Sequence, residues 1–280
     1  MQFQRIYVDS RDREIGGTAS EFDYQLANNV VVPEESIAVL DSVLIPNSWY
    51  TVEKLKNDRI YLSEVNRGTT TYRIATIQQG YYDADSLAEA AADALNEGTT
   101  LSEAYRGRFN PTSGRIEIDH VFNFGDEAVH IATEEALKTI LDLCLWPGFN
   151  SRQQLMGCFR QLGLTTGPVV SMGISLNKIE VSMPQVPNLQ NHNQVFIKGN
   201  LGIPGLVQGP RGGQDILRRV VVTAGSLALN YDQAGTHYDN IRVAPGTISC
   251  LKFKLTGYDG QVIDLQGAEW SCSIVIYPRD

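Results

Sequence analysis

The 280-residue chain is long enough to form one large domain or two modest ones, and either can bury a core without covalent crosslinks. Its formal net charge of −9 disfavours a general phosphate-binding surface, so direct nucleic-acid binding is not expected. No apolar run approaches the roughly 18 residues that a transmembrane helix needs. The N-terminus lacks a basic patch followed by an apolar stretch, so no secretory signal is expected.

The first fifty residues predict β-sheet. Apolar and polar residues alternate from Phe3 to Val8 and again from Phe22 to Leu26, which is typical of strands with one buried face. Ile37 to Ile45 is nearly continuous in apolar residues and is ended by Pro46, as expected for a strand covered on both faces. Between the first two strands lies a charged and glycine-containing turn, Asp9 to Gly17.

A helix is predicted to end at Glu97. Its apolar residues fall at i, i+4, i+7 and i+8, on one face; they are Leu87, Ala91, Ala94 and Leu95. Ser86 and Glu89 have the spacing of a capping box, with Asp83 or Asp85 as alternative caps. Gly98 suits the left-handed residue just past the helix.

Short strands and further helices surround this helix. The expected elements are strands at Arg59 to Ser63, Thr71 to Ile77, Ala104 to Phe109 and Arg115 to Asp119, a helix from Glu134 to Leu145 capped by Thr133, and a short helix within Arg152 to Gly163. The mixed segment 70–165 differs from the strand-rich flanks. We therefore expect residues 70–165 to form an inserted α+β unit, with 1–69 and 166–280 as the two parts of one jelly roll.

Strands return in the last hundred residues. They are predicted at Asn177 to Met183, Gln194 to Lys198, Ile216 to Val222, Leu227 to Leu229, Asn240 to Val243, Thr247 to Gly257 and Trp270 to Tyr277. Gly199 to Gly213 has six glycines and two prolines in fifteen residues, which indicates a mobile or partner-ordered loop. Asn230 to Thr236 is polar and is expected to be a loop tip. Many short strands with helices confined to one block favour an antiparallel sandwich, and we expect a mainly β, single jelly-roll fold.

Three segments resemble vertex (penton) capsid proteins of virophages, Polinton-like elements and related large double-stranded DNA viruses. They are Asp9 to Arg13, Phe22 to Leu26 and Ala38 to Tyr50, with a looser likeness over the last thirty residues. The resemblance implies a minor capsid protein that forms homopentamers at icosahedral vertices beside double-jelly-roll major capsid proteins. It also implies location in the virion, after assembly in the infected cell.

The charged cluster after the first strand is the candidate subunit contact. Asp9, Arg11 and Arg13 would belong to an N-terminal arm whose arginines form two-pronged contacts with carboxylates of a neighbouring subunit. The alternative is a turn held by local ion pairs, each worth about 0–1 kcal/mol when exposed.

Chemistry-bearing motifs are scarce, so no enzyme activity, catalytic residue, metal or cofactor is expected. The four histidines, His120, His130, His192 and His237, lack metal-ligand spacing. The nearest approach to a carboxylate–imidazole group is Asp232, His237 and Asp239.

The cysteines are expected to be free thiols. Cys144, Cys158, Cys250 and Cys272 have no C-x-x-C spacing, and a chain of this length does not need a disulfide framework. A bridge between Cys250 and Cys272 remains open, because both lie on strands that can be neighbours.

The alternative to a capsid role is a lectin-like or receptor-binding β-sandwich that stacks aromatic loop residues on sugar rings. The candidate residues are Trp49, Tyr50, Tyr81, Tyr82, Trp146, Tyr231 and Tyr238.

Overall fold

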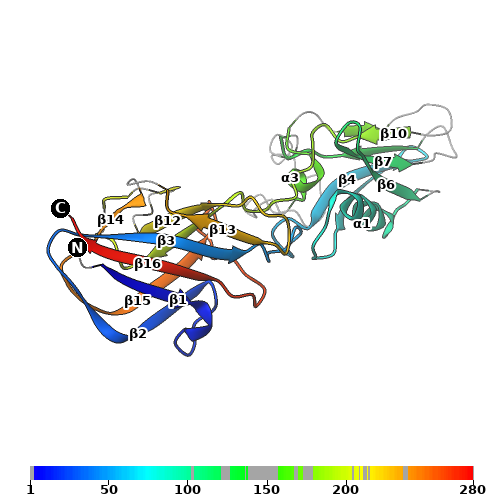
Figure 1. Ribbon diagram of the computed structural model, residues 1–280. Coiled ribbons are helices and arrows are strands. Elements are labelled where there is room, and N and C mark those ends of the chain that lie inside the picture. Colours follow the sequence, from blue (N-terminus) through cyan, green and yellow to red (C-terminus); the bar gives the residue numbers. More distant parts are fainter. Residues whose placement is uncertain are drawn as a thin grey trace. The chain divides into compact units, whose positions relative to one another are not determined.

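The computed structural model describes residues 3–101, 104–120, 127–135, 137, 157–166, 170–172, 179–203, 205–207, 209–210, 213, 215–235 and 239–279. The chain forms two compact units: unit 1 comprises Met1–Trp49 and His192–Asp280, and unit 2 comprises Tyr50–Asn191 (Figure 1). Among the helices in the described residues, none is long and apolar enough to span a membrane.

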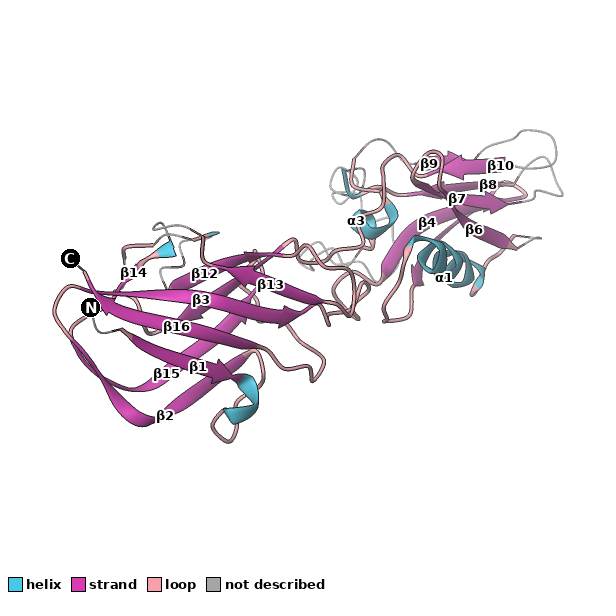
Figure 2. Ribbon diagram, in the orientation of Figure 1, coloured by secondary structure: helices cyan, strands magenta, loops and turns pink. Residues whose placement is uncertain are grey.

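Unit 1 contains two antiparallel sheets (Figure 2). The first sheet has the order β1-β16-β3-β13, with β14 also paired to β3, and the second has the order β12-β11-β15-β2. Their strands are β1 (Gln4–Asp9), β2 (Glu21–Val32), β3 (Ser36–Pro46), β11 (Gln194–Gly199), β12 (Ile216–Val221), β13 (Leu229–Gln233), β14 (Ile241–Arg242), β15 (Gly246–Thr256) and β16 (Ser271–Pro278). A short 3-10 helix, η1 (Ser10–Asp12), follows β1.

The strand order is that of a jelly roll. Because β13 and β14 pair with successive parts of the same edge of β3, they count as one interrupted strand. In chain order the first sheet is then strands one, eight, three and six, and the second is two, seven, four and five. This Greek-key arrangement confirms the predicted mainly β, antiparallel fold. Unit 2 enters the chain between the third and fourth of these strands.

Alternating residues of both sheets form the core of unit 1. An aromatic group joins the two sheets: the ring centroid of Phe22 lies 5.5 Å from that of Phe253 and 5.9 Å from that of Trp270. The indole of Trp270 donates a hydrogen bond to the carbonyl of Ala19 at 2.7 Å, which satisfies its buried N–H. These strands were predicted because their apolar residues recur at every second position.

The strand predicted from Phe3 to Val8 is confirmed as β1, which is an integral strand of the first sheet. It pairs with β16 over its full length, from Gln4 opposite Ile276 to Asp9 opposite Ser271. Ile6 and Val8 are buried in the core. The two apolar side chains therefore hold this segment in the sheet, as its alternation had indicated.

The expected loop tip from Asn230 to Thr236 is wrong for its first part, because β13 extends to Gln233 and pairs with β3. Asn230 is only 2% exposed, and its side-chain oxygen accepts hydrogen bonds from the backbone N–H groups of Thr223 and Ala224 at 3.0 and 2.9 Å. Its amide donates to the carbonyl of Ile45 at 3.3 Å. A polar residue can thus lie inside a sheet when its groups are satisfied.

Unit 2 contains two smaller antiparallel sheets, ordered β5-β4-β8-β9 and β10-β7-β6. The strands are β4 (Arg59–Asn66), β5 (Thr69–Thr76), β6 (Tyr105–Asn110), β7 (Arg115–His120), β8 (Ala128–Ile131), β9 (Val170–Met172) and β10 (Ile179–Ser182), and the helices are α1 (Ala84–Asn96) and α3 (Phe159–Leu162). The unit is longer than the predicted 70–165 insertion. Its ends lie further out because β4, which precedes residue 70, pairs with both β5 and β8.

Most helix signals are confirmed where the residues are described. Asp83, one of the two alternative caps, caps α1 in a capping box with Ser86, so the expected Ser86–Glu89 box is wrong. Gly98 has φ 74° just beyond the helix. Leu137 donates its backbone N–H to the carbonyl of Thr133, as expected for a helix start, but residues 136 and 138–145 of that predicted helix lie outside the described residues. α3 ends at Gly163, which is left-handed.

Gly107 marks the closest approach of α1 to β6. A Cβ atom at this position would lie 1.8 Å from the carbonyl oxygen of Ala88 and 3.3 Å from the Cβ of Ala92. We expect Gly107→Ala to lower the free energy of unfolding by about 1–3 kcal/mol, because backbone atoms must move apart. Urea denaturation measures the effect. Gly225→Ala is the control, since nothing lies within 4 Å of its Cβ position; equal stability of the two variants would contradict the prediction.

Candidate functional site

The charged cluster after β1 forms a local turn. The carboxylate of Asp9 accepts a hydrogen bond from the backbone N–H of Arg11 and two from its guanidinium, at 2.9, 2.9 and 2.6 Å. This contact lowers the pKa of Asp9 and raises that of Arg11, because it favours both charged forms. The arrangement corresponds to the local ion-pair alternative.

Arg13 contacts a different part of the same chain. Its Nη1 lies 2.9 Å from both carboxylate oxygens of Glu269 and 2.6 Å from the carbonyl oxygen of Ser10. The hydroxyl of Ser10 donates to Glu269 and accepts from the backbone N–H of Trp270 at 3.0 Å. Glu269 was missed in the sequence, since no local pattern links it to Arg13. A subunit contact by Asp9, Arg11 and Arg13 stays a prediction.

Asp232 and Asp239, two members of the expected carboxylate–imidazole group, are brought together by Arg218. The Nε of Arg218 donates to Asp232, its Nη1 lies 3.7 Å from Asp239, and Nη1 also donates to the carbonyl of Leu40 at 3.1 Å. Arg218 lies on β12 of the second sheet, whereas Asp232 lies on β13 of the first. The group therefore ties the two sheets together; His237 lies outside the described residues.

The candidate sugar-stacking aromatics do not form one set. Trp49 is only 4% exposed and packs edge-on against His192 in unit 1, with ring centroids 5.3 Å apart. Tyr50 and Tyr81 contact each other in unit 2, at 4.7 Å. Tyr231 is 60% exposed but lies on a strand. Tyr82 donates its hydroxyl to the carbonyl of Gln78, and Trp146 and Tyr238 lie outside the described residues.

The three described cysteines are free thiols, as expected. Cys250 and Cys272 do not pair: both thiols are free, and they lie on β15 and β16 of different sheets. Cys272 and Cys158 are buried, and burial raises the pKa of Cys272 to about 12. Among the described residues, no cluster of histidine, cysteine or acidic side chains is arranged to hold a metal ion.

The outer face of the first sheet carries exposed apolar side chains. We call Tyr7, Leu44, Leu229 and Tyr231 the outer patch; their exposed fractions run from 39% for Leu44 to 69% for Tyr7. Tyr231 lies directly opposite Leu44 on the neighbouring strand. A groove of about 400 Å³ separates Tyr7 from Leu44. Small and acidic residues line it, among them Ser42, Ser271, Ser273, Asp9 and Asp12.

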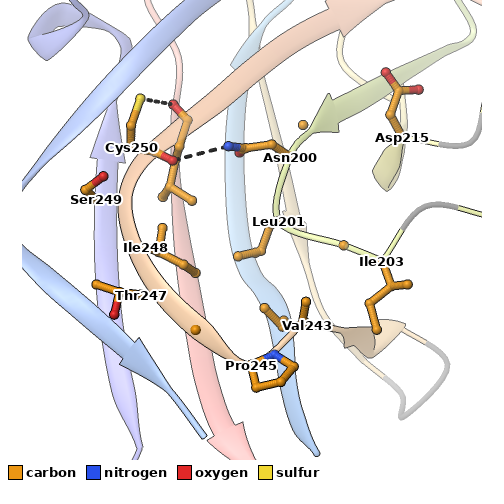
Figure 3. A pocket seen from close by; sticks show the side chains of 15 residues that line it. Asn200, Leu201, Ile203, Asp215, Val243, Pro245, Thr247, Ile248, Ser249 and Cys250 are labelled. Carbon is orange, nitrogen blue, oxygen red and sulfur yellow. Dashed lines mark hydrogen bonds between the residues drawn. The ribbon is translucent and has the colours of Figure 1, made fainter. Parts of the chain in front are cut away.

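The outer face of the second sheet carries ion pairs. Ion pairs connect β15 to β2: Lys252 lies 3.3 Å from Asp23, and Lys254 lies 3.0 Å from Glu21. Beside these strands, a cavity of about 710 Å³ lies between Gly199–Ile203 and Val243–Leu251 (Figure 3). Ion pairs lie on both outer faces, because Arg5 on β1 lies 3.3 Å from Asp41 on β3, but the first sheet also carries the outer patch.

Comparisons with known proteins identify the class of fold. No family model matches the sequence, and no curated protein matches it. The structure is similar to the crystal structure of the selenomethionine-labelled mavirus penton protein, with a TM-score of 0.54 and 9% sequence identity. The match covers 99% of this chain and 99% of that chain. This likeness shows that the chain has a fold of the kind found in a viral penton protein.

Proposed function

We propose that this chain is a structural capsid protein that forms pentameric vertex capsomers of an icosahedral double-stranded DNA virus or virophage. The observation that carries the proposal is the whole-length likeness to the mavirus penton protein, which extends through both compact units. The motifs around Asp9, Phe22 and Ala38, which resemble penton proteins, support it from the sequence. In this role the protein lies in the virion beside double-jelly-roll major capsid proteins, and it needs no cofactor or catalytic residue.

A ring of identical subunits requires two different surfaces on each subunit, which meet head to tail. The sandwich offers two different surfaces, because the first sheet carries the outer patch whereas the lysine–carboxylate pairs of β15 and β2 lie on the second sheet. Exposed apolar patches on soluble proteins mark interaction surfaces. We propose that the outer patch is covered by a neighbouring copy in the ring.

Mass photometry of the purified protein tests the proposal. We expect pentamers, or monomers that form pentamers as the concentration rises. A stable monomer or trimer with measurable glycan affinity would contradict the capsid proposal and favour a lectin-like module.

The double variant Leu229→Ser/Tyr231→Ser is expected to weaken the pentamer by about 10- to 100-fold in concentration, because two apolar side chains no longer lose water on assembly. Tyr258→Ser is the control, since Tyr258 is equally exposed, at 62%, but lies in the turn after β15. Sedimentation velocity measures both. If the double variant forms pentamers at the same concentration as wild type, the outer patch is not the subunit contact. The proposal that the protein forms pentamers would still stand.

A further inference from the structure

One edge of β15 is only partly paired. On one side β15 pairs with β2 from Gly246 to Lys254. On the other side it pairs with β11 only from Phe253 to Thr256. Along Gly246–Leu251 this second side has no strand partner within the described residues. An open ladder of this kind offers backbone donors and acceptors to an additional strand.

The side chain of Asn200 shows what this edge accepts. Its amide nitrogen donates to the carbonyl of Cys250 at 3.2 Å, and its amide oxygen accepts from the backbone N–H of Lys252 at 2.9 Å. The amide side chain thus satisfies one acceptor and one donor of β15 that the backbone of a paired strand would otherwise satisfy. Asn200 comes directly after β11, so this contact marks the point where the β11 ladder stops.

Beyond Asn200 the edge borders the cavity of about 710 Å³ (Figure 3). Leu201 and Val243 are 4% and 5% exposed and line it together with the half-buried Ile248. The cavity is therefore apolar at its base and lined by main chain along one wall. Six residues of an extended strand span roughly 20 Å, which matches the length of the open Gly246–Leu251 edge.

We propose that this edge and its cavity, the β15 slot, bind an extended segment of another polypeptide chain. The incoming segment hydrogen-bonds to β15 along Gly246–Cys250, in line with β11, and directs every second side chain onto Leu201, Val243 and Ile248. Main-chain bonds supply affinity in this mode of recognition, and the apolar base selects the side chains. An apolar small molecule would leave the backbone groups of the slot without partners. The inference stands independently of the capsid proposal.

The test uses the full chain and a fluorescent peptide with the sequence of β11, Gln-Val-Phe-Ile-Lys-Gly, since β11 already pairs with β15. Its matched control has the same side chains but carries N-methyl groups on alternate backbone nitrogens, which removes ladder donors. Binding is measured by fluorescence anisotropy and by hydrogen exchange of residues 246–250. At nine-tenths occupancy we expect the amides that face the slot to exchange about tenfold more slowly, because exchange then occurs from the free fraction.

Cys250 supplies an independent readout, because it is half-buried at the slot whereas Cys158 and Cys272 are buried. In a Cys144→Ser background, the peptide should slow alkylation of Cys250 about tenfold, to the same extent as it slows amide exchange.

Equal binding of the N-methylated peptide would show an apolar pocket and overturn the proposal. Unchanged exchange with the unmodified peptide at millimolar concentration would also overturn it. So would strong protection, in the isolated protein, of those amides of residues 246–250 that face the slot, because the chain would then fill the slot itself.

Discussion

Glu64→Gln is expected to lower the free energy of unfolding of unit 2 by about 3–5 kcal/mol, since it breaks a buried ion pair from one side. Glu64 lies on β4 and is fully buried. Its Oε1 accepts hydrogen bonds from Arg73, Thr99 and Tyr105 at 2.6, 2.9 and 2.8 Å. Its Oε2 accepts two from Thr100, both at 2.9 Å. A glutamine would point its N–H groups at donors and leave the charge of Arg73 uncompensated.

The same hydrogen-bond network makes the stability of unit 2 depend on pH. Burial by itself raises the pKa of Glu64, but the hydrogen bonds from the backbone of Thr100 and from Arg73 and Tyr105 outweigh it, and the pKa is lowered. A carboxylate with a lowered pKa stabilises the fold at neutral pH, and this stabilisation is lost as the pH falls below the ordinary glutamate value of about 4.3. The difference between wild type and Glu64→Gln should therefore shrink in acid.

Urea denaturation at pH 7 and at pH 3 to 4 measures both effects, followed by a probe in unit 2. Tyr105→Phe is the matched control, because it removes one hydrogen bond to the carboxylate and should cost about 1.5–3 kcal/mol. Burial raises the pKa of Tyr105, so its hydroxyl stays protonated and donates across this range. A Gln variant as stable as wild type at neutral pH would contradict the assigned role of Glu64.

Arg218→Met is expected to cost unit 1 about 3 kcal/mol, because it leaves a buried carbonyl and a carboxylate without their donor. Arg218 is 9% exposed and donates to Asp232 and to the carbonyl of Leu40 from the opposite sheet. Methionine retains much of the apolar contact of the arginine stem, so the loss reports on the guanidinium.

The variant Arg218→Lys distinguishes the effect of the positive charge from the effect of the planar guanidinium geometry. Lysine keeps the positive charge but lacks the planar fork that reaches two acceptors at once, so we expect it to recover less than half of the loss. Guanidinium-chloride denaturation of the three proteins measures the series. Full recovery by lysine would show that charge alone matters, and an unchanged Met variant would contradict the tie between the sheets.

Local signals in the sequence were sufficient for most elements. The cap at Asp83, the glycine at Gly98 and the alternation in β2, β15 and β16 predicted elements that the structure contains. These features are readable because each depends on residues within a few positions of one another. The failures occurred where distant residues decide the outcome. Asn230 reads as a loop residue, yet contacts with Thr223, Ala224 and Ile45 keep it in a strand.

The candidate site was predicted in part only. The sequence located the Asp9–Arg13 cluster, but it did not indicate Glu269 as the partner of Arg13, or Arg218 as the residue that joins Asp232 and Asp239. Neither pairing has a local pattern, because the partners lie on different strands. The outer patch was equally hidden, since strand register decides which apolar residues face outward.

By itself the sequence determined the class of the fold, a mainly β antiparallel sandwich, because the period of apolar residues encodes which face of each strand is buried. Tertiary structure alone decided that β1 is an edge strand, that unit 2 extends to Tyr50 and Asn191, and that β11 stops short of the β15 slot. These features depend on strand pairing between distant segments. The free energy of such pairing is shared among contacts across the whole sheet, so no single stretch of sequence records it.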